Sequence, residues 1–250
     1  MSPRAVAWPH RLADLLVLLA LLAWWLGARG LPEFVLPGPI AVGRRLLQLF
    51  IDPGFLAHTL ASLWRVFASV AVALVLGGAL ALVERGIPAL EYVVRGGIAP
   101  FLNSFPSIGW AILAAIWFEP GSFAIIFVQV AILVPFCLIN IGQGLRELDP
   151  ELTEFARAYT RHRRRTLLLV TVPLMMPYVL GALRIAYGIA WKISLVAELL
   201  GSTDGLGYLM LQAQSAADLT TVLAACFAII LLFVAGERLV LDPLARRFAR

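Results

Sequence analysis

The sequence predicts an all-α, polytopic membrane protein with six transmembrane helices. Of its 250 residues, 61% are hydrophobic and only 14% are charged, whereas about a quarter of the residues in soluble domains are charged. The apolar residues fall in uncharged blocks, each close to the roughly 20 residues that a membrane-spanning helix needs: 66–83, 98–118, 120–145 and 219–236. No room remains for a sizeable soluble domain.

The expected spans follow the chain in order. The first is short, and its Trp24 and Trp25 lie where an interfacial aromatic belt is typical. We expect residues 1–57 to form an N-terminal transmembrane helix and an external connecting segment. Residues 58–250 are expected to form a core domain of five transmembrane helices that includes the loop 146–173. The six predicted spans are 12–27, 59–83, 98–118, 122–142, 173–200 and 219–240.

The basic residues predict the orientation. If the N-terminus is cytoplasmic, most arginines lie on the inside, and the outside receives only Arg29, Arg44 and Arg45. This asymmetry follows the positive-inside rule and predicts that both termini are cytoplasmic. The first apolar segment also fits a cleaved signal peptide, an alternative that leaves five spans.

The segment 31–57 connects the first two spans and is rich in Pro and Gly. After its turn at 37–39, apolar residues at helical spacing surround Arg44 and Arg45 and predict a short helix. Two placements fit equally well: on the outer membrane surface, or packed against the other spans.

A charged stretch, 146–166, lies between the fourth and fifth spans. Asp149-Pro150-Glu151 is a helix start, with an Asp N-cap, a Pro at the first position and an acid in the first turn. One apolar face follows at helical spacing, formed by Leu152, Phe155, Ala156 and Tyr159. A capped amphipathic helix beside a basic run favours docking to a partner. A positive-inside loop resting on lipid headgroups explains the arginines but not the cap.

This stretch resembles the EAA loop of importer permeases of the ABC superfamily. Glu154-Phe155-Ala156 is followed by Val170-Thr171-Val172-Pro173, with the Glu-to-Pro spacing of that motif. Further segments resemble the nitrate, sulfonate and taurine branch of the binding-protein-dependent transport family, over nearly the whole chain: 36–39, 58–66, 105–110, 117–118 and 205–207.

The resemblance implies a type I ABC importer permease fold with cytoplasmic coupling helices, in a bacterial inner membrane. Glu154, Phe155, Ala156 and Thr160 would belong to the loop that docks on an ATPase dimer, and Pro173 would close the second coupling helix. ATP and magnesium would bind to that ATPase, and no cofactor to this chain. The other implied partners are a second permease chain, a periplasmic or lipid-anchored solute-binding protein and the lipid membrane.

Two positions depart from the EAA motif. Phe155 replaces its first Ala, and Thr160 replaces its Gly. A glycine supplies turn conformations that a β-branched residue resists, so the departure at Thr160 affects the angle between the two coupling helices. It fits a permease that pairs with a different permease chain, or drift within a homodimer. We favour the homodimer.

Several polar residues interrupt the expected spans and are candidates for the solute path. Charges within a membrane usually face a bundle interior or water. In the fifth span these are Arg184, Lys192 and Glu198. Arg184 lies nearer mid-membrane and also fits pairing with a carboxylate or a helix-end carbonyl, the interpretation that we favour. Lys192 lies about 28 Å beyond Pro173 at 1.5 Å per residue. It fits either a contact with an anionic solute, such as a sulfonate, taurine or nitrate, or snorkelling to the outer interface.

In the third span, the interruption includes Asn103 and Phe105, next to Pro106. Proline permits a kink in a membrane helix. The resemblance to importer permeases implies that this segment lies beside the solute path, and on that ground we expect a gate at 105–110.

Other classes of protein fit poorly. None of the three histidines, His10, His58 and His162, can pair with a serine at mid-membrane, so an intramembrane hydrolase is excluded, and no catalytic or metal site is expected. The chain lacks a Gly-Lys-Ser/Thr phosphate loop. The basic residues lie between membrane segments, which argues against nucleic acid as a partner. A stand-alone secondary transporter remains the alternative, although it gives no reason for the capped cytoplasmic helix.

Overall fold

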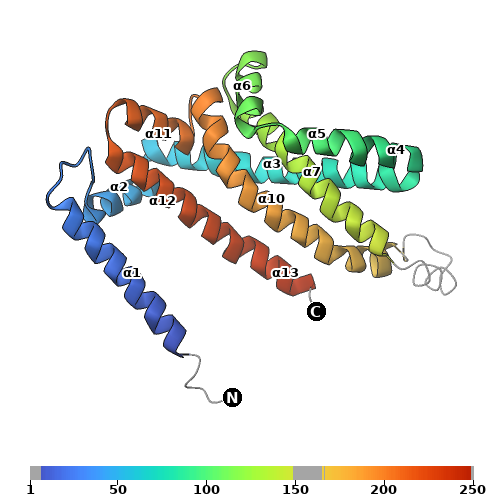
Figure 1. Ribbon diagram of the computed structural model, residues 1–250, viewed down its shortest axis with the longest axis horizontal. Coiled ribbons are helices and arrows are strands. Elements are labelled where there is room, and N and C mark those ends of the chain that lie inside the picture. The colour runs from blue at the N-terminus through green and yellow to red at the C-terminus, as the bar shows by residue number, and fades with distance from the viewer. Residues whose placement is uncertain (1–6, 149–164, 166, 249–250) are drawn as a thin grey trace.

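The computed structural model describes residues 7–148, 165 and 167–248, and every regular element within these ranges is helical (Figure 1). Four helices are long and apolar enough to cross a membrane: α3 (Pro53–Gly86), α7 (Ser122–Glu147), the helix formed by η2 (Leu167–Thr171) and α10 (Val172–Gly201), and the helix formed by α12 (Leu219–Gly236), η3 (Glu237–Leu241) and α13 (Asp242–Phe248). The second, fourth, fifth and sixth predicted spans are therefore confirmed as long apolar helices.

The third predicted span, 98–118, is not one straight helix. The region forms α4 (Pro88–Val93), η1 (Val94–Ile98) and α5 (Ala99–Ser104), and the chain then turns by 85° into α6 (Ser107–Trp117). Pro106 causes the break because it restricts the residue before it to extended backbone, and Phe105 has φ −71° and ψ 128°. The structure thus supports four spans, or five if the bent pair counts as one, and the six-span count is not confirmed.

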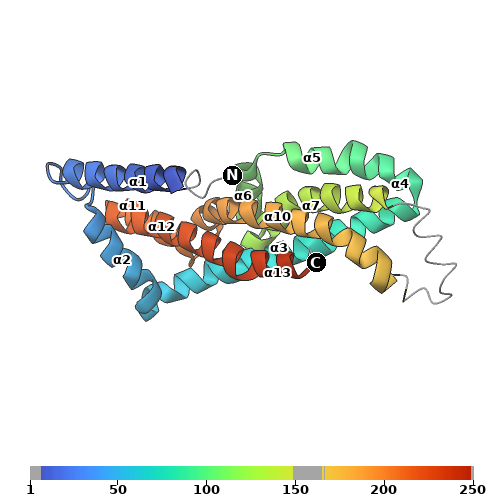
Figure 2. The same ribbon diagram turned by 90° about the horizontal axis from the view of Figure 1, so that it is seen from below.

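Helix α1 (Ala7–Ala28) corresponds to the first predicted span, and its apolar part is shorter than the four long helices. It stands apart from the bundle in the view of Figure 1, and Figure 2 shows it alongside α11 and α12. Near its C-terminal end, Trp24 donates a hydrogen bond from Nε1 to the carbonyl of Pro37 at 3.0 Å and stacks on Phe227 of α12.

The short helix predicted after the Pro-Gly turn is α2 (Pro39–Ile51). It packs against α12, and Val42 and Leu49 are buried there together with residues of α11 (Leu206–Ser215). Its opposite face leaves Ile40 and Ile51 at 70% and 74% exposure. Packing against the other spans, one of the two predicted placements, is confirmed, and a position on the outer membrane surface stays a prediction.

The centre of the bundle is formed by α3, α7 and α10. Small residues allow these helices to approach closely. A Cβ added to Gly77 of α3 would lie 2.6 Å from Cβ of Cys137 in α7. Helix α3 also begins earlier than predicted, at Pro53, because Asp52 caps it by accepting a hydrogen bond from the backbone N–H of Gly54 at 2.9 Å. The predicted boundary at residue 57 therefore lies inside this helix.

Candidate functional site

A groove of about 700 Å³ runs between α10 and α12. The two helices run side by side in Figure 1 but make little direct contact, because α12 packs mainly against α2 and α11. The walls are mainly apolar, and two basic side chains reach the groove, Arg184 and Lys192. The complete lining is Arg184, Ile185, Gly188, Ile189, Trp191, Lys192, Leu195, Cys226, Ile229, Ile230 and Phe233.

Arg184 closes one end of the groove. Its guanidinium Nη2 lies 2.5 Å from Oδ1 of Asp242, where η3 leads into α13. This ion pair neutralises the charge and joins α10 to the C-terminal helix. Arg184 is thus engaged by a carboxylate in this arrangement.

Lys192 is the sole lysine of the chain. Its side chain is exposed, and no carboxylate lies within 4.0 Å of it among the residues that the structure describes. A charge inside a bilayer is costly unless it meets water, a partner charge or the membrane surface. A lysine in the wall of an otherwise apolar groove is therefore available to an anion.

Asn103 and Phe105 are not part of this groove. Asn103 is exposed at the end of α5. The centroids of the Phe105 and Trp110 rings are 4.8 Å apart. The Phe105 ring also covers Gly109, where an added Cβ would lie 2.8 Å from the Phe105 ring. The two residues lie next to the 85° bend, and neither of them lines the groove that contains Arg184 and Lys192. Their role in the path stays a prediction.

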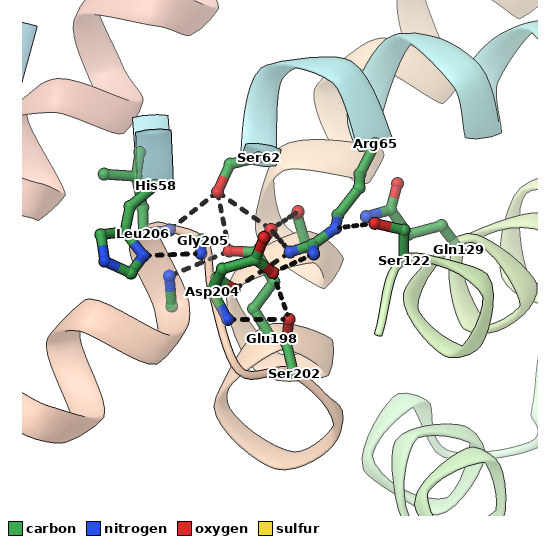
Figure 3. A network of polar contacts seen from close by, with 12 residues as sticks. His58, Ser62, Arg65, Ser122, Gln129, Glu198, Ser202, Asp204, Gly205 and Leu206 are labelled. Carbon is green, nitrogen blue, oxygen red and sulfur yellow. Dashed lines mark hydrogen bonds and ion pairs between the residues drawn. The ribbon is translucent and has the colours of Figure 1, made fainter. Parts of the chain in front are cut away.

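Glu198 has a different environment from the other residues predicted for the path. It is only 1% exposed and forms an ion pair with Arg65 of α3, whose side chain is also 1% exposed. The distance from Arg65 Nη1 to Glu198 Oε1 is 3.2 Å (Figure 3). In this arrangement the Glu198 carboxylate joins α3 to α10 and does not face the groove.

We call the set that surrounds this ion pair the Arg65 network: His58, Ser62, Arg65, Ser122, Glu198, Ser202, Asp204 and the backbone of 205–207. Arg65 donates from Nε to Oγ of Ser122 in α7 at 3.1 Å and from Nη1 to the backbone carbonyl of Asp204 at 3.0 Å. Its Nη2 pairs with the Asp204 carboxylate. One guanidinium therefore holds α3, α7, α10 and the turn after α10 together (Figure 3).

The backbone of that turn completes the network. The N–H of Gly207 donates to Glu198 Oε2 at 2.9 Å, and the N–H of Leu206 donates to Oγ of Ser62 at 2.8 Å. Two glycines make this close approach possible. Gly205 has φ +103°, and a Cβ on Gly207 would lie 2.6 Å from the carbonyl oxygen of Leu195.

Asp204 and His58 form the outer part of the network. The N–H of Gly205 donates to Nδ1 of His58 at 3.0 Å. Partial burial on its own would raise the pKa of Asp204, but hydrogen bonding and the charge of Arg65, with the hydroxyl of Ser202, hold that pKa below its ordinary value. The Asp204 side chain is still 49% exposed, so this turn is both anchored and accessible.

Sequence reasoning missed the Arg65 network. Segments 58–66 and 205–207 were noted only for a family resemblance, and the turn near Asp204 had no assigned role. The available signal was one charged residue, Arg65, inside an apolar block, because such a charge requires a partner.

Most residues predicted to contact an ATPase, namely Glu154, Phe155, Ala156 and Thr160, lie outside the described residues. Pro173 is described and is the second residue of α10, directly after the π-helical turn η2. The other edge of this loop is also described: Glu147, at the end of α7, accepts a hydrogen bond from the hydroxyl of Tyr178. This hydrogen bond joins the C-terminal end of α7 to the N-terminal part of α10, the two helices from which the loop 146–173 extends.

Comparison with known proteins decides the family. Residues 73–248 match the family described as binding-protein-dependent transport system inner membrane component. The chain belongs to this family. The match spans more than half of the chain, so this protein is a membrane permease of an ABC importer.

Individual relatives agree. The permease is 29% identical to the taurine transport system permease protein of Escherichia coli (strain K12), over 91% of this chain and 84% of that protein. It is 30% identical to a probable ABC transporter permease protein of Brucella melitensis biotype 1, over 82% of this chain and 83% of the relative. The nitrate import permease protein of Synechococcus elongatus is 25% identical over 82% of this chain and 78% of its own length.

A solved structure of the MetNI methionine ABC transporter in inward-facing conformations has the same fold. The TM-score is 0.59 at 20% identity, with 77% of this chain and 98% of that chain covered. Together these findings confirm the predicted ABC importer permease fold and the multi-pass membrane placement of this permease.

Proposed function

We propose that this permease imports a small anion and that the groove beside Lys192 forms its half of the solute path. The observation that carries the proposal is the exposed, sole lysine in an apolar groove of about 700 Å³. Relatives are named for the transport of taurine, bicarbonate and nitrate. Each of these solutes carries a negatively charged sulfonate, carbonate or nitrate group, which a lysine ammonium attracts.

The apolar walls give this attraction its strength. A charge pair interacts more strongly in a medium of low dielectric constant than in water. A single ammonium group is also a weaker holder of an oxyanion than the bidentate fork of an arginine. A path must bind a solute well enough to admit it and weakly enough to release it, and one lysine meets both requirements.

The energy for import comes, in this proposal, from a separate ATPase dimer that binds ATP and magnesium. The loop 146–173, with Glu154, Phe155, Ala156 and Thr160 in its first part and Pro173 at its end, docks on that dimer. Two observations support this role: the EAA spacing in the sequence, and the Glu147–Tyr178 hydrogen bond that joins the two helices from which the loop extends.

The remaining partners follow from the family. A solute-binding protein, periplasmic or lipid-anchored, delivers the anion to the outer side, and a second permease chain supplies the other half of the path. We favour a homodimer, and a heterodimer with a more typical EAA loop is the alternative. The chain lies in the bacterial inner membrane with both termini in the cytoplasm, as the distribution of arginines indicates.

The experiment uses the whole transporter, reconstituted in proteoliposomes with its ATPase and binding protein. Uptake of nitrate, bicarbonate and taurine is measured for the wild type, Lys192→Gln and Lys192→Arg. We expect uptake of the transported anion to fall about tenfold or more in Lys192→Gln, equivalent to about 1.4 kcal/mol, and to be partly kept in Lys192→Arg. Arg238→Gln, which removes an exposed arginine outside the groove, is the control and should not change uptake.

A second readout uses the single lysine. A small, water-soluble, amine-reactive reagent should modify Lys192 in the intact complex. An excess of the transported anion should slow this modification. Mass spectrometry separates the Lys192 product from the modified N-terminus. Unchanged uptake in Lys192→Gln, together with labelling that is indifferent to the anion, would return Lys192 to a snorkelling role and remove the support for an anionic solute.

A further inference from the structure

A second group of charged side chains lies at the other end of the bundle, where α3 and α7 end. We call it the Arg95 cluster: Glu84 at the end of α3, Glu91 in α4, Arg95 in η1 and Arg146 at the end of α7. Three of them, Glu84, Glu91 and Arg146, line a small cavity of about 180 Å³. Neither the groove nor the Arg65 network includes any of them.

The inner part of the cluster is the ion pair between the buried Glu84 and Arg95. Glu84 is only 5% exposed, and its Oε1 pairs with Nε of Arg95. Its second oxygen, Oε2, has no hydrogen-bond partner among the described residues. Gly142 of α7 leaves the space for the guanidinium, because a Cβ at that position would overlap Nη2 of Arg95. A buried carboxylate of this kind fixes the position of η1 against α3 and α7.

The outer half is exposed and weak. Glu91 Oε1 lies 3.6 Å from Nη1 of Arg146 and 4.0 Å from Nε of Arg95, and the side chains of Glu91 and Arg146 are 50% and 51% exposed. Exposed ion pairs contribute only about 0.2–1 kcal/mol to stability. The Glu91–Arg146 pair can therefore break and re-form without unfolding the protein.

The position of the cluster in the chain gives it two neighbours. Arg146 is the first residue of the loop 146–173, which is proposed above to dock on the ATPase. Glu91 and Arg95 belong to the segment Pro88–Ser104, which ends at the 85° bend beside Phe105. The cluster thus lies between the start of the loop and the predicted gate.

We infer that the Arg95 cluster couples the loop 146–173 to the predicted gate at 105–110. A displacement of the loop acts through Arg146 on Glu91 and moves the segment Pro88–Ser104, and with it the bend at Phe105. Glu91 and Arg146 are positioning residues in this mechanism, and neither contacts solute or nucleotide. The inference rests on the proposed docking role of the loop. It requires that the pair differ between two states of the transporter, because coupling needs an element with two arrangements.

The test measures solute imported per ATP hydrolysed in proteoliposomes that contain the complete transporter. Glu91→Gln and Arg146→Gln should each lower this ratio by about twofold or more, while the amount of bound ATPase stays at the wild-type level. The exchange of charges in Glu91→Arg/Arg146→Glu should restore most of the ratio. Glu119→Gln, which removes an exposed carboxylate with no ion pair in the described part of the chain, serves as the control.

Gly142→Ala adds a test that changes no charge. Its methyl group should displace the Arg95 guanidinium from Glu84 and lower the same ratio. Wild-type ratios in Glu91→Gln and Arg146→Gln would overturn the inference, and so would a charge exchange that restores nothing. If the wild-type complex holds no ATPase at all, the proposed docking function fails instead, so the two failures are distinguished by the wild type alone.

Discussion

Arg65 and Glu198 form an ion pair inside the bundle, with 3.2 Å between Nη1 of Arg65 and Oε1 of Glu198. Each side chain is only 1% exposed. The two residues are 133 positions apart in the sequence. Their pairing joins α3 to α10 close to the turn that leads into α11 (Figure 3). Isolated buried charges are very costly, so each residue requires the other.

Glu198→Ala should destabilise the protein. Removing one member of a buried ion pair costs about 3–5 kcal/mol, and we expect the lower end because Asp204 still pairs with Arg65. Thermal unfolding of the purified protein in detergent measures the loss. The double variant Arg65→Met/Glu198→Leu should recover a large part of it, since no buried charge is left alone. If the double variant is as unstable as the sum of both single variants, the ion pair is not the reason for the loss.

Gly207→Ala should also destabilise the fold, by forcing the turn away from Glu198. The added Cβ would lie 2.6 Å from the Leu195 carbonyl oxygen, a backbone atom that cannot easily move. The matched control is Gly181→Ala in α10, where nothing lies within 4 Å of the added Cβ and alanine is favoured over glycine in a helix by about 1 kcal/mol. The midpoint of thermal unfolding should fall for Gly207→Ala and stay the same or rise for Gly181→Ala. Equal midpoints for the two variants would contradict the close approach.

The Asp204 carboxylate predicts a dependence on pH. Although partial burial alone raises its pKa, the hydrogen bonds and charge of Arg65 lower it below the ordinary 3.8. A lowered pKa means that the charged form stabilises the folded state. This contribution is fully present above the ordinary value and is lost as the pH falls through the lowered one.

Thermal unfolding of the wild type and Asp204→Asn should therefore differ at neutral pH, with the variant less stable. The difference should shrink as the pH falls below the ordinary aspartate pKa. A difference that stays constant down to the lowest pH at which the protein remains folded would show that the charge of Asp204 is unimportant.

Glu154→Lys should release the ATPase or abolish coupled import, while the chain still inserts in the membrane. The reason is the reversed charge at the position that matches the acidic residue of the EAA loop. Co-purification of the ATPase and ATP-dependent uptake are the measurements. Glu119→Lys makes the same charge reversal between α6 and α7 and should leave both unchanged. Normal uptake in Glu154→Lys would count against the docking role of this loop.

The long helices could be predicted from the sequence, because an uncharged block of about 20 residues in a membrane protein almost always forms a helix that spans the membrane. It was less informative where one residue redirects the chain. Pro106 was expected to permit a kink, and instead it separates α5 from α6 by an 85° turn. Asp52-Pro53 starts α3 earlier than the apolar block indicates.

The side-chain pairings could not be predicted. Which residue faces Arg65 depends on how α3 and α10 rotate and cross, and hydrophobic periodicity is weak in helices that are apolar on all sides. The same reason hid the pairing of Arg184 with Asp242 and the cluster around Arg95. In contrast, a lysine within the fifth predicted span was a visible candidate, and the structure places Lys192 in a groove.

The central claim is that this chain is the permease subunit of an ATP-driven anion importer. Its most direct test is to purify the chain from its native host in a mild detergent, identify the proteins that accompany it, and measure anion uptake in proteoliposomes with and without ATP. The account predicts an ATPase subunit at a fixed stoichiometry and uptake that stops when ATP is removed. A chain that purifies without an ATPase and takes up the anion after ATP depletion would contradict it.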